Sequence, residues 1–317
     1  MTAPAVEIDA QYRQLREECG LVERPDRGLL IVRGSEAAEY LQGQLTNDVE
    51  AIGPGEGAYA ALLDRKGHMQ ADMRVLRPGE DPEFLLDLEP EGLAAAARHL
   101  QMYKIGREVE VADESENHLL ASLIGPRAVE VAGTAALPEN ACETRTISGV
   151  RCVAVGAAAG VDLIFSAGKR DLVREALLSA GAVEASPEAA EILRIESGRP
   201  RFGAEMGTET MPAEAGIVEQ AVSFTKGCYI GQETVARLHY KGKPNRHLRG
   251  LRLSGPAQRG DALRLGEKEI GKVGSAAVSP ALGTIGLAIL RREAEPGATL
   301  AVGEDGVTAE VVALPFG

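Results

Sequence analysis

Cys228 has the sequence surroundings of a reactive thiol. Lys226 precedes it by two residues, and the sequence predicts a helix that begins near Gly231 and runs through Leu238. A nearby ammonium group and a helix N-terminus both favour the thiolate, the nucleophilic form of cysteine. The flanking glycines, Gly227 and Gly231, indicate a tight turn or the close approach of another molecule. On these residues alone, a reactive cysteine and a buried cysteine that packs as a small hydrophobic side chain are equal alternatives.

A basic segment surrounds this cysteine. Between Lys226 and Arg252 the chain has seven basic residues and one acid, whereas the whole protein carries a net charge of −13. This contrast indicates an anion-binding segment, and a solvated surface loop is the alternative. The negative total charge and the scarcity of stacking aromatics argue against direct nucleic-acid binding. The cations that follow the cysteine include Arg237, Lys241, Lys243, Arg246 and Arg249.

The composition is that of a globular protein of two or three domains, since the chain has 317 residues, 44% hydrophobic and 26% charged. The four cysteines are far apart and form no C-x-x-C pair, so we predict no disulfide framework and no metal site. The first ten residues do not resemble a secretory signal, and no apolar run reaches the roughly 18 residues of a membrane span. We therefore expect a cytoplasmic protein with no membrane partner.

Strands and helices alternate irregularly along the chain. The apolar run 29–32 and the segments 59–63, 69–76, 84–88, 118–124, 150–155 and 161–165 are predicted strands. Predicted helices follow Ser35 as N-cap and cover residues 90–103, 126–132, 169–178 and 187–197. This order favours an α+β fold. From about residue 245, short strands at 248–253, 262–265, 270–278, 284–290 and 307–313 predict a small barrel.

The segment Lys226–Arg237, K-G-C-Y-I-G-Q-E-T-V-A-R, resembles the signature of the YgfZ-type folate-binding proteins. These proteins are relatives of the glycine-cleavage T-protein, an aminomethyltransferase. The resemblance covers most of the chain, because further blocks follow the family pattern in the same order: Tyr40–Val49, Leu62–Gly67, Arg194–Gly203 and Met211–Gly216. The cysteine motif separates YgfZ-like members from true aminomethyltransferases.

The resemblance implies a cloverleaf of three subdomains around a central hole that holds the folate, and a C-terminal β-barrel. Residues 1–243 are then the folate-binding, aminomethyltransferase-like region of two subdomains, and residues 244–317 are the barrel. The implied cofactor is tetrahydrofolate or a one-carbon derivative of it. These expectations agree with the domain boundary near residue 243, where Lys241–Pro244 has the sequence of a linker.

The resemblance also assigns cofactor-binding residues. Glu196 is the implied pterin anchor, because a carboxylate can accept two N–H donors from an aminopyrimidine edge. Asp72, Tyr229 and Gln232 are assigned to cofactor binding as well. Arg237, with the basic residues that follow it, is expected to receive the glutamate tail of the folate.

One departure from the family bears on function. Aminomethyltransferases carry an Asp–Asp pair where this chain has Ala71 and Asp72, and a lost proton-handling acid costs an enzyme about 10²- to 10⁴-fold. The resemblance therefore implies an accessory factor that supports assembly or repair of iron–sulfur enzymes and tRNA modification, with Cys228 as the reactive group and Lys226 beside it. Its partners would be folate and iron–sulfur enzymes or their assembly proteins. The alternative is a folate-dependent aminomethyltransferase or methyltransferase.

Overall fold

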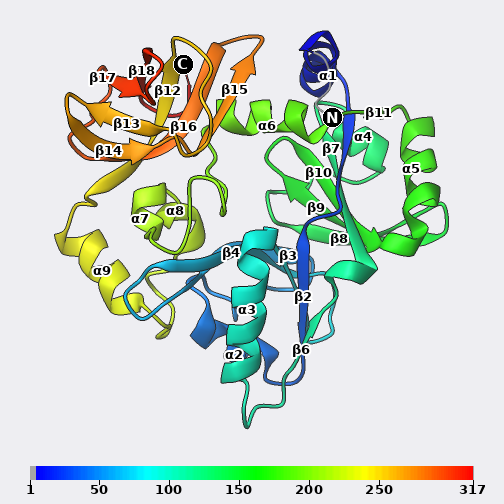
Figure 1. The fold of residues 1–317 in the computed structure, drawn as a ribbon. Helices are drawn as coiled ribbons and strands as arrows, with labels where there is room; N and C mark the ends of the chain where they lie inside the picture. Colours follow the sequence, from blue (N-terminus) through cyan, green and yellow to red (C-terminus); the bar gives the residue numbers. More distant parts are fainter. Residues whose placement is uncertain (1–4, 317) are drawn as a thin grey trace. The chain divides into compact units, whose positions relative to one another are not determined.

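The computed structural model describes residues 5–316, which form two compact units (Figure 1). The first unit comprises the described residues up to Leu63, Gln70–Ala190 and Gln220–Ile230. The second comprises Asp64–Met69, Glu191–Glu219 and the described residues from Gly231 onward. The predicted division at residue 243 follows the sequence alone and stays a prediction.

A five-stranded sheet in the first unit carries two helices on one face. In sheet order its strands are β3 (Glu56–Leu63), β4 (Met69–Arg77), β5 (Glu83–Leu88), β2 (Gly28–Arg33) and β6 (Glu110–Asp113). Helices α2 (Ala37–Gln44) and α3 (Pro90–Tyr103) bury their apolar sides in one core with this sheet. Proline at the first position of α3 is well placed, because that residue needs no intrahelical N–H bond.

A six-stranded sheet in the same unit packs against the opposite face of the first sheet. Its order is β11 (Val183–Glu184), β1 (Gly20–Arg24), β7 (His118–Ile124), β10 (Gly160–Ser166), β9 (Val150–Ala157) and β8 (Cys142–Ile147). Helices α4 (Ala128–Ala132) and α5 (Arg170–Ser179) contribute to its outer core. The remaining elements of this unit are α1 (Ala5–Glu17) and two 3₁₀ turns, Ser115–Asn117 and Ala167–Lys169.

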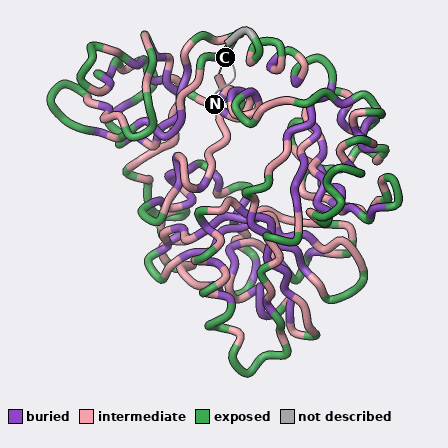
Figure 2. The backbone as a smooth tube through the Cα atoms, turned by 45° about the vertical axis from the view of Figure 1, so that its right-hand side comes forward, coloured by how far each residue is buried: buried purple, intermediate pink, exposed green. Residues whose placement is uncertain are grey.

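Strand β2 shows why an uninterrupted apolar run forms a strand here. Side chains alternate between the two faces of a sheet. Leu30 and Val32 enter the core shared with α2 and α3, whereas Leu29 faces the six-stranded sheet. Both faces of β2 are therefore covered, and its residues from Gly28 to Val32 are buried. Figure 2 shows the buried stretches of the chain in purple.

The second unit is built on a seven-stranded sheet. Its order is β14 (Lys268–Lys272), β13 (Ala262–Leu265), β17 (Thr299–Val302), β18 (Val307–Val312), β12 (Arg246–Leu253), β16 (Gly283–Arg291) and β15 (Ser275–Ser279). The sheet curls, because β14 packs against β16 although the two are not hydrogen-bonded neighbours. Helices α7 (Pro212–Ala215) and α9 (Gln232–Lys241) belong to this unit, and α6 (Pro187–Glu196) and α8 (Val218–Ala221) run between the units in sequence.

The α+β class and the barrel-like C-terminal sheet are confirmed, two local predictions are wrong, and several short strands were missed. Ser35 is not the N-cap of α2, because Glu36 takes that position and the Ser35 hydroxyl donates to Glu108. The single strand predicted over 270–278 is two strands, β14 and β15. They separate at Gly274, where a side chain would meet Glu205 at 2.8 Å. Strands β1, β8, β11 and β17 were not predicted, and each of them is short. In the described part of the chain, no helix is long and apolar enough to cross a membrane.

Candidate functional site

Asp72 presents a buried carboxylate oxygen without a partner in the first unit. Its neighbours Ala71 and Met73 enter the core under α2 and α3, so Asp72 lies on the other face of β4. The side chain is 8% exposed, and the Tyr59 hydroxyl donates to its Oδ2 atom at 2.5 Å. Within residues 5–316, Oδ1 is buried and has no hydrogen-bond partner. A buried acceptor left unpaired costs about 1–3 kcal/mol, so a ligand N–H group would be stabilised there.

The electrostatics keep this oxygen available as an acceptor at neutral pH. Burial raises the pKa of Asp72 to about 6, against the opposing effects of the Tyr59 hydrogen bond and the charge of Arg27. Burial, followed by the Asp72 charge, raises the pKa of Tyr59 well above its usual value. Tyr59 therefore remains a hydrogen-bond donor, and Asp72 ionises near pH 6. The pair holds one carboxylate oxygen in place, while the other is buried and has no hydrogen-bond partner among the described residues.

A buried ion-pair network lies on the same side of the unit. Arg27 donates to both oxygens of Asp87, at 2.9 and 2.7 Å, and also binds Glu89. Arg74 donates to an Asp87 oxygen at 2.7 Å and to an Asp162 oxygen at 2.6 Å, and so links the two acids. Burial alone would raise the pKa of Asp87, but the charges of Arg27 and Arg74 hold this pKa well below its usual range. Both oxygens of Asp87 are therefore hydrogen-bonded within the protein, unlike those of Asp72 on β4.

The position of Ala71 shows where the second acid of the aminomethyltransferase Asp–Asp pair would lie in this fold. Ala71 is fully buried in the apolar core of the first unit. An acid at this position would enter that core and not the polar face that carries Asp72. The absence of a second acid therefore removes no group from the face with the unpaired oxygen.

Lys226 is a structural cation in this fold. Its ammonium group donates to the carbonyl oxygens of Gln42 at 2.5 Å, Leu45 at 2.6 Å and Asn47 at 2.9 Å. These carbonyls lie at the C-terminal end of α2, where the helix dipole favours positive charge. Burial lowers the pKa of Lys226 to about 8, against the opposing charges of Asp48 and another acid nearby. All three donors are used, so the ammonium has a role that sequence spacing did not predict. A catalytic role for it stays a prediction.

Replacing Lys226 by methionine is expected to lower the free energy of unfolding by about 2 kcal/mol. The change keeps the aliphatic chain but leaves three carbonyl oxygens without their donor, and the relief of ammonium desolvation offsets part of that loss. Urea unfolding measures the effect. Lys241→Met, at an exposed position on α9, is the matched control and should change stability by less than about 0.5 kcal/mol. Equal stabilities of the two variants would contradict this role.

Near this lysine, hydrogen bonds join residues 46–47 to residues 220–223, which are far apart in the sequence. The Thr46 hydroxyl donates to the carbonyl of Ala221 at 2.5 Å, and the Ser223 amide donates to the Thr46 carbonyl at 3.0 Å. The Asn47 amide group donates to the Gln220 carbonyl at 3.0 Å. The block from Tyr40 to Val49 therefore holds the backbone that leads into the cysteine motif.

Cys228 is exposed, whereas the other three cysteines are buried. Burial is the main cause that raises the pKa of each buried thiol to about 11, so these thiols are unreactive near neutral pH. They are Cys19, Cys142 and Cys152. Tyr229 is buried next to the exposed cysteine, with the Lys226 ammonium 5.1 Å from its ring centroid. The sequence motif thus contains an accessible thiol beside two anchoring residues.

The other predicted cofactor-binding residues lie in the second unit. Glu196 ends α6, and the Ser279 hydroxyl donates to its Oε1 atom at 2.5 Å. Gln232 is the first residue of α9, and Arg237 is exposed on the same helix. Lys226, Cys228, Tyr229 and Asp72 belong to the first unit.

Arg246 was predicted to bind the glutamate tail of the folate, but it already has a partner in this structure. Its guanidinium donates to both carboxylate oxygens of Glu214, at 2.9 and 2.7 Å, and to the Glu209 carbonyl. The charge of Arg246 is therefore balanced within the second unit. Lys241 and Lys243 are exposed, so binding of the folate tail by these two residues stays a prediction.

Sequence reasoning does not identify Tyr59 as a site residue. It lies in β3 next to β4, and its neighbours Ala58 and Ala60 face the same core as Ala71. This parity places Tyr59 on the face that carries Asp72. The signal was present in the alternation of the two predicted strands, but their register was not known.

Comparisons with known proteins cover most of the chain. Residues 4–226 match the GCVT N-terminal domain, and residues 246–316 match the glycine cleavage T-protein C-terminal barrel domain. An aminomethyltransferase of Rubrobacter xylanophilus is 31% identical over 98% of this chain and 86% of its own length. The mitochondrial iron–sulfur cluster assembly factor IBA57 of Mus musculus is 31% identical over 84% of this chain and 76% of its own length.

A solved structure gives the same fold. The glycine cleavage system aminomethyltransferase T from Bartonella henselae superposes with a TM-score of 0.86 and covers 98% of this chain and 89% of that one. Its sequence identity is 21%, so the likeness concerns the fold alone.

Proposed function

Because this chain belongs to the family of the glycine cleavage T-protein, we propose that it binds a tetrahydrofolate cofactor and supports iron–sulfur enzymes through Cys228. The observation that carries the binding part is the buried Oδ1 atom of Asp72, which has no partner in the described residues. Reduced folates carry several N–H donors, and a carboxylate accepts such donors in charge-assisted hydrogen bonds. The residues present therefore fit the cofactor that the family implies.

Each proposed binding residue has its own task. Asp72 accepts an N–H group of the reduced folate, and Tyr59 fixes the carboxylate for that purpose. Glu196 accepts N–H donors of the pterin, with one of its oxygens oriented by Ser279. The bound folate supplies a carrier for one-carbon units. Arg237 and Gln232 on α9 stay proposed contacts for the remainder of the cofactor.

The accessory role rests on Cys228 and on the nature of the relatives. The K-G-C-Y-I-G-Q-E block resembles the signature of the YgfZ-type proteins, and one relative is named as an iron–sulfur cluster assembly factor. An exposed thiol can form a mixed disulfide or lend a single ligand to a cluster, but one thiol per chain cannot hold a cluster alone. Iron–sulfur enzymes or their assembly proteins are therefore the proposed partners, with support of tRNA modification as a consequence.

Glu196→Gln is expected to weaken tetrahydrofolate binding at least tenfold, which corresponds to about 1.4 kcal/mol. The amide keeps the shape of the side chain but replaces one acceptor with a donor that faces another donor. Isothermal titration calorimetry measures the affinity. Glu188→Gln, at an exposed position in the first turn of α6, is the matched control and should bind like the wild type. Unchanged affinity of a folded Glu196→Gln variant would remove Glu196 from the site.

A second candidate function is aminomethyl transfer. The Rubrobacter relative is named aminomethyltransferase, and Asp72 can exchange a proton near neutral pH because burial raises its pKa to about 6. Turnover of an aminomethyl-loaded carrier protein with tetrahydrofolate tests it. Turnover that persists in Cys228→Ser but not in Asp72→Asn would favour the transferase over the accessory factor.

A further inference from the structure

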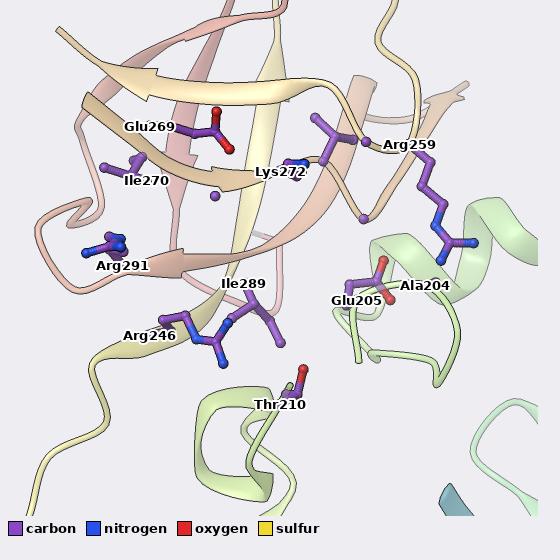
Figure 3. A pocket seen from close by; sticks show the side chains of 14 residues that line it. Ala204, Glu205, Thr210, Arg246, Arg259, Glu269, Ile270, Lys272, Ile289 and Arg291 are labelled. Atoms are coloured by element: carbon purple, nitrogen blue, oxygen red, sulfur yellow. The ribbon is translucent and has the colours of Figure 1, made fainter. Parts of the chain in front are cut away.

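A groove of about 610 Å³ lies in the second unit, along the curled sheet (Figure 3). Four cationic and two acidic side chains line it, although the whole chain has a net charge of −13. The cations come from separate elements: Arg246 begins β12, Lys272 ends β14, Arg291 ends β16, and Arg259 lies in the loop between β12 and β13. Such convergence makes a local positive potential in a concave surface, which concentrates anions.

Two of these arginines face each other across the sheet. Arg246 of β12 is the register partner of Arg291 of β16, and both line the groove. The next pair outward is hydrogen-bonded, because the Arg292 amide donates to the Asn245 carbonyl at 2.8 Å. Arg246 and Arg291 therefore form the closer, non-hydrogen-bonded type of pair, with Cα atoms about 4.5 Å apart. Like charges directly opposite destabilise a sheet, and here Glu214 balances Arg246 alone, which leaves Arg291 without an ion-pair partner among the described residues.

The acids of the second unit do not balance this charge fully. Glu214 pairs with Arg246 alone, and Glu205 is fully buried in contact with Arg194 at 3.0 Å. Within the described chain, no carboxylate lies within ion-pair distance of Arg259, Lys272 or Arg291. One acid of the lining, Glu269, is exposed and opposes them. An excess of positive charge therefore remains in the groove.

The lining also indicates what kind of anion fits. Figure 3 shows Arg246 and Arg291 on one side of the groove, Arg259 on the other, and the apolar side chain of Ile289 between them. Ile270 also borders the groove, but its side chain is buried in the core of the second unit. No aromatic residue lines the groove to stack on a base. Guanidinium forks match carboxylates, and an aliphatic spacer suits the apolar floor.

We propose that this groove binds a small aliphatic molecule with two or more carboxylate groups, held at one end by Arg291 and at the other by Arg259 and Lys272. None of the residues that line the groove is among those proposed for folate binding, and this proposal does not depend on them. The carboxylates pair with the three cations of the groove that have no ion-pair partner among the described residues. Thermal unfolding of the full chain with glutarate, a five-carbon dicarboxylate, tests the proposal against sodium chloride at equal ionic strength.

Glutarate is expected to raise the melting temperature saturably and by more than sodium chloride does, since a ligand that binds the folded state stabilises it. Arg291→Gln and Lys272→Gln should each weaken glutarate binding at least fivefold by calorimetry. Lys268→Gln, which alters an exposed pair with Glu293 on the same sheet, is the control and should bind like the wild type.

Three results would overturn the proposal. The first is a melting shift with glutarate no larger than that with sodium chloride. The second is unchanged glutarate affinity in both Arg291→Gln and Lys272→Gln, which would locate binding elsewhere. The third is tighter binding of pyrophosphate than of glutarate, which would assign the groove to phosphate ligands.

Discussion

Replacing Cys228 by serine is expected to abolish the restoration of iron–sulfur enzyme activity in cells that lack the native protein. The substitution changes one exposed atom, so the fold and tetrahydrofolate affinity should remain within twofold of the wild type. Serine cannot form a mixed disulfide or act as a thiolate ligand, and this loss accounts for the expected effect. Activity of an iron–sulfur enzyme in cell extracts, compared at equal protein levels, measures it.

A second cysteine provides the control for this result. Cys152 is fully buried, and Cys152→Ala should retain the restoring activity while losing some stability through the smaller side chain. Alkylation of the native protein followed by mass spectrometry should label Cys228 first, and Cys19, Cys142 and Cys152 only after unfolding. Full restoration by Cys228→Ser would show that the thiol is dispensable.

Asp72→Asn is expected to weaken tetrahydrofolate binding at least tenfold at pH 7.5. The exchange removes the negative charge that strengthens the hydrogen bond from the ligand, a loss of about 1.5–3 kcal/mol for a buried charged acceptor. Asp81→Asn, at an exposed position in the β4–β5 loop, makes the same chemical change without affecting the site. Equal affinities of the two variants would remove Asp72 from the cofactor site.

Because the pKa of Asp72 is raised, we expect both tetrahydrofolate affinity and protein stability to depend on pH. In the wild type, binding should weaken roughly tenfold from pH 7.5 to pH 5, because a carboxyl with a pKa of about 6 is mostly protonated at pH 5. For stability the sign is opposite. A carboxyl whose pKa is raised on folding binds more protons in the folded state, so its charged form destabilises the fold above pH 6. The ligand-free Asp72→Asn variant should therefore gain stability relative to the wild type at pH 7, and this gain should shrink towards pH 4.

The elements that sequence reasoning located well are those fixed by local patterns. The continuous apolar run of β2 reflects burial on both faces, and Pro90 marks the start of α3 correctly. Strand β1 escaped prediction because it is stabilised by neighbours far along the chain. Pairing of Gly20 with Val183, for example, is not encoded near either residue.

The site shows the same limit more sharply. Lys226 lies two residues from Cys228, so local spacing suggested that its ammonium serves the thiol. Its actual partners are carbonyls at the end of α2, about 180 positions earlier in the chain. The pairing of Arg246 with Glu214 likewise depends on tertiary contacts. Residue types predicted which groups are chemically capable, whereas the fold decided which of them are already engaged.

The proposed cofactor role is tested most directly by titrating tetrahydrofolate into three folded proteins at pH 7.5 in a calorimeter. We predict saturable one-to-one binding to the wild type, the same affinity within twofold for Cys228→Ser, and at least tenfold weaker binding for Asp72→Asn. This pattern would separate the cofactor site from the reactive thiol. Absence of saturable binding to the wild type, or equal affinity of Asp72→Asn, would contradict the account.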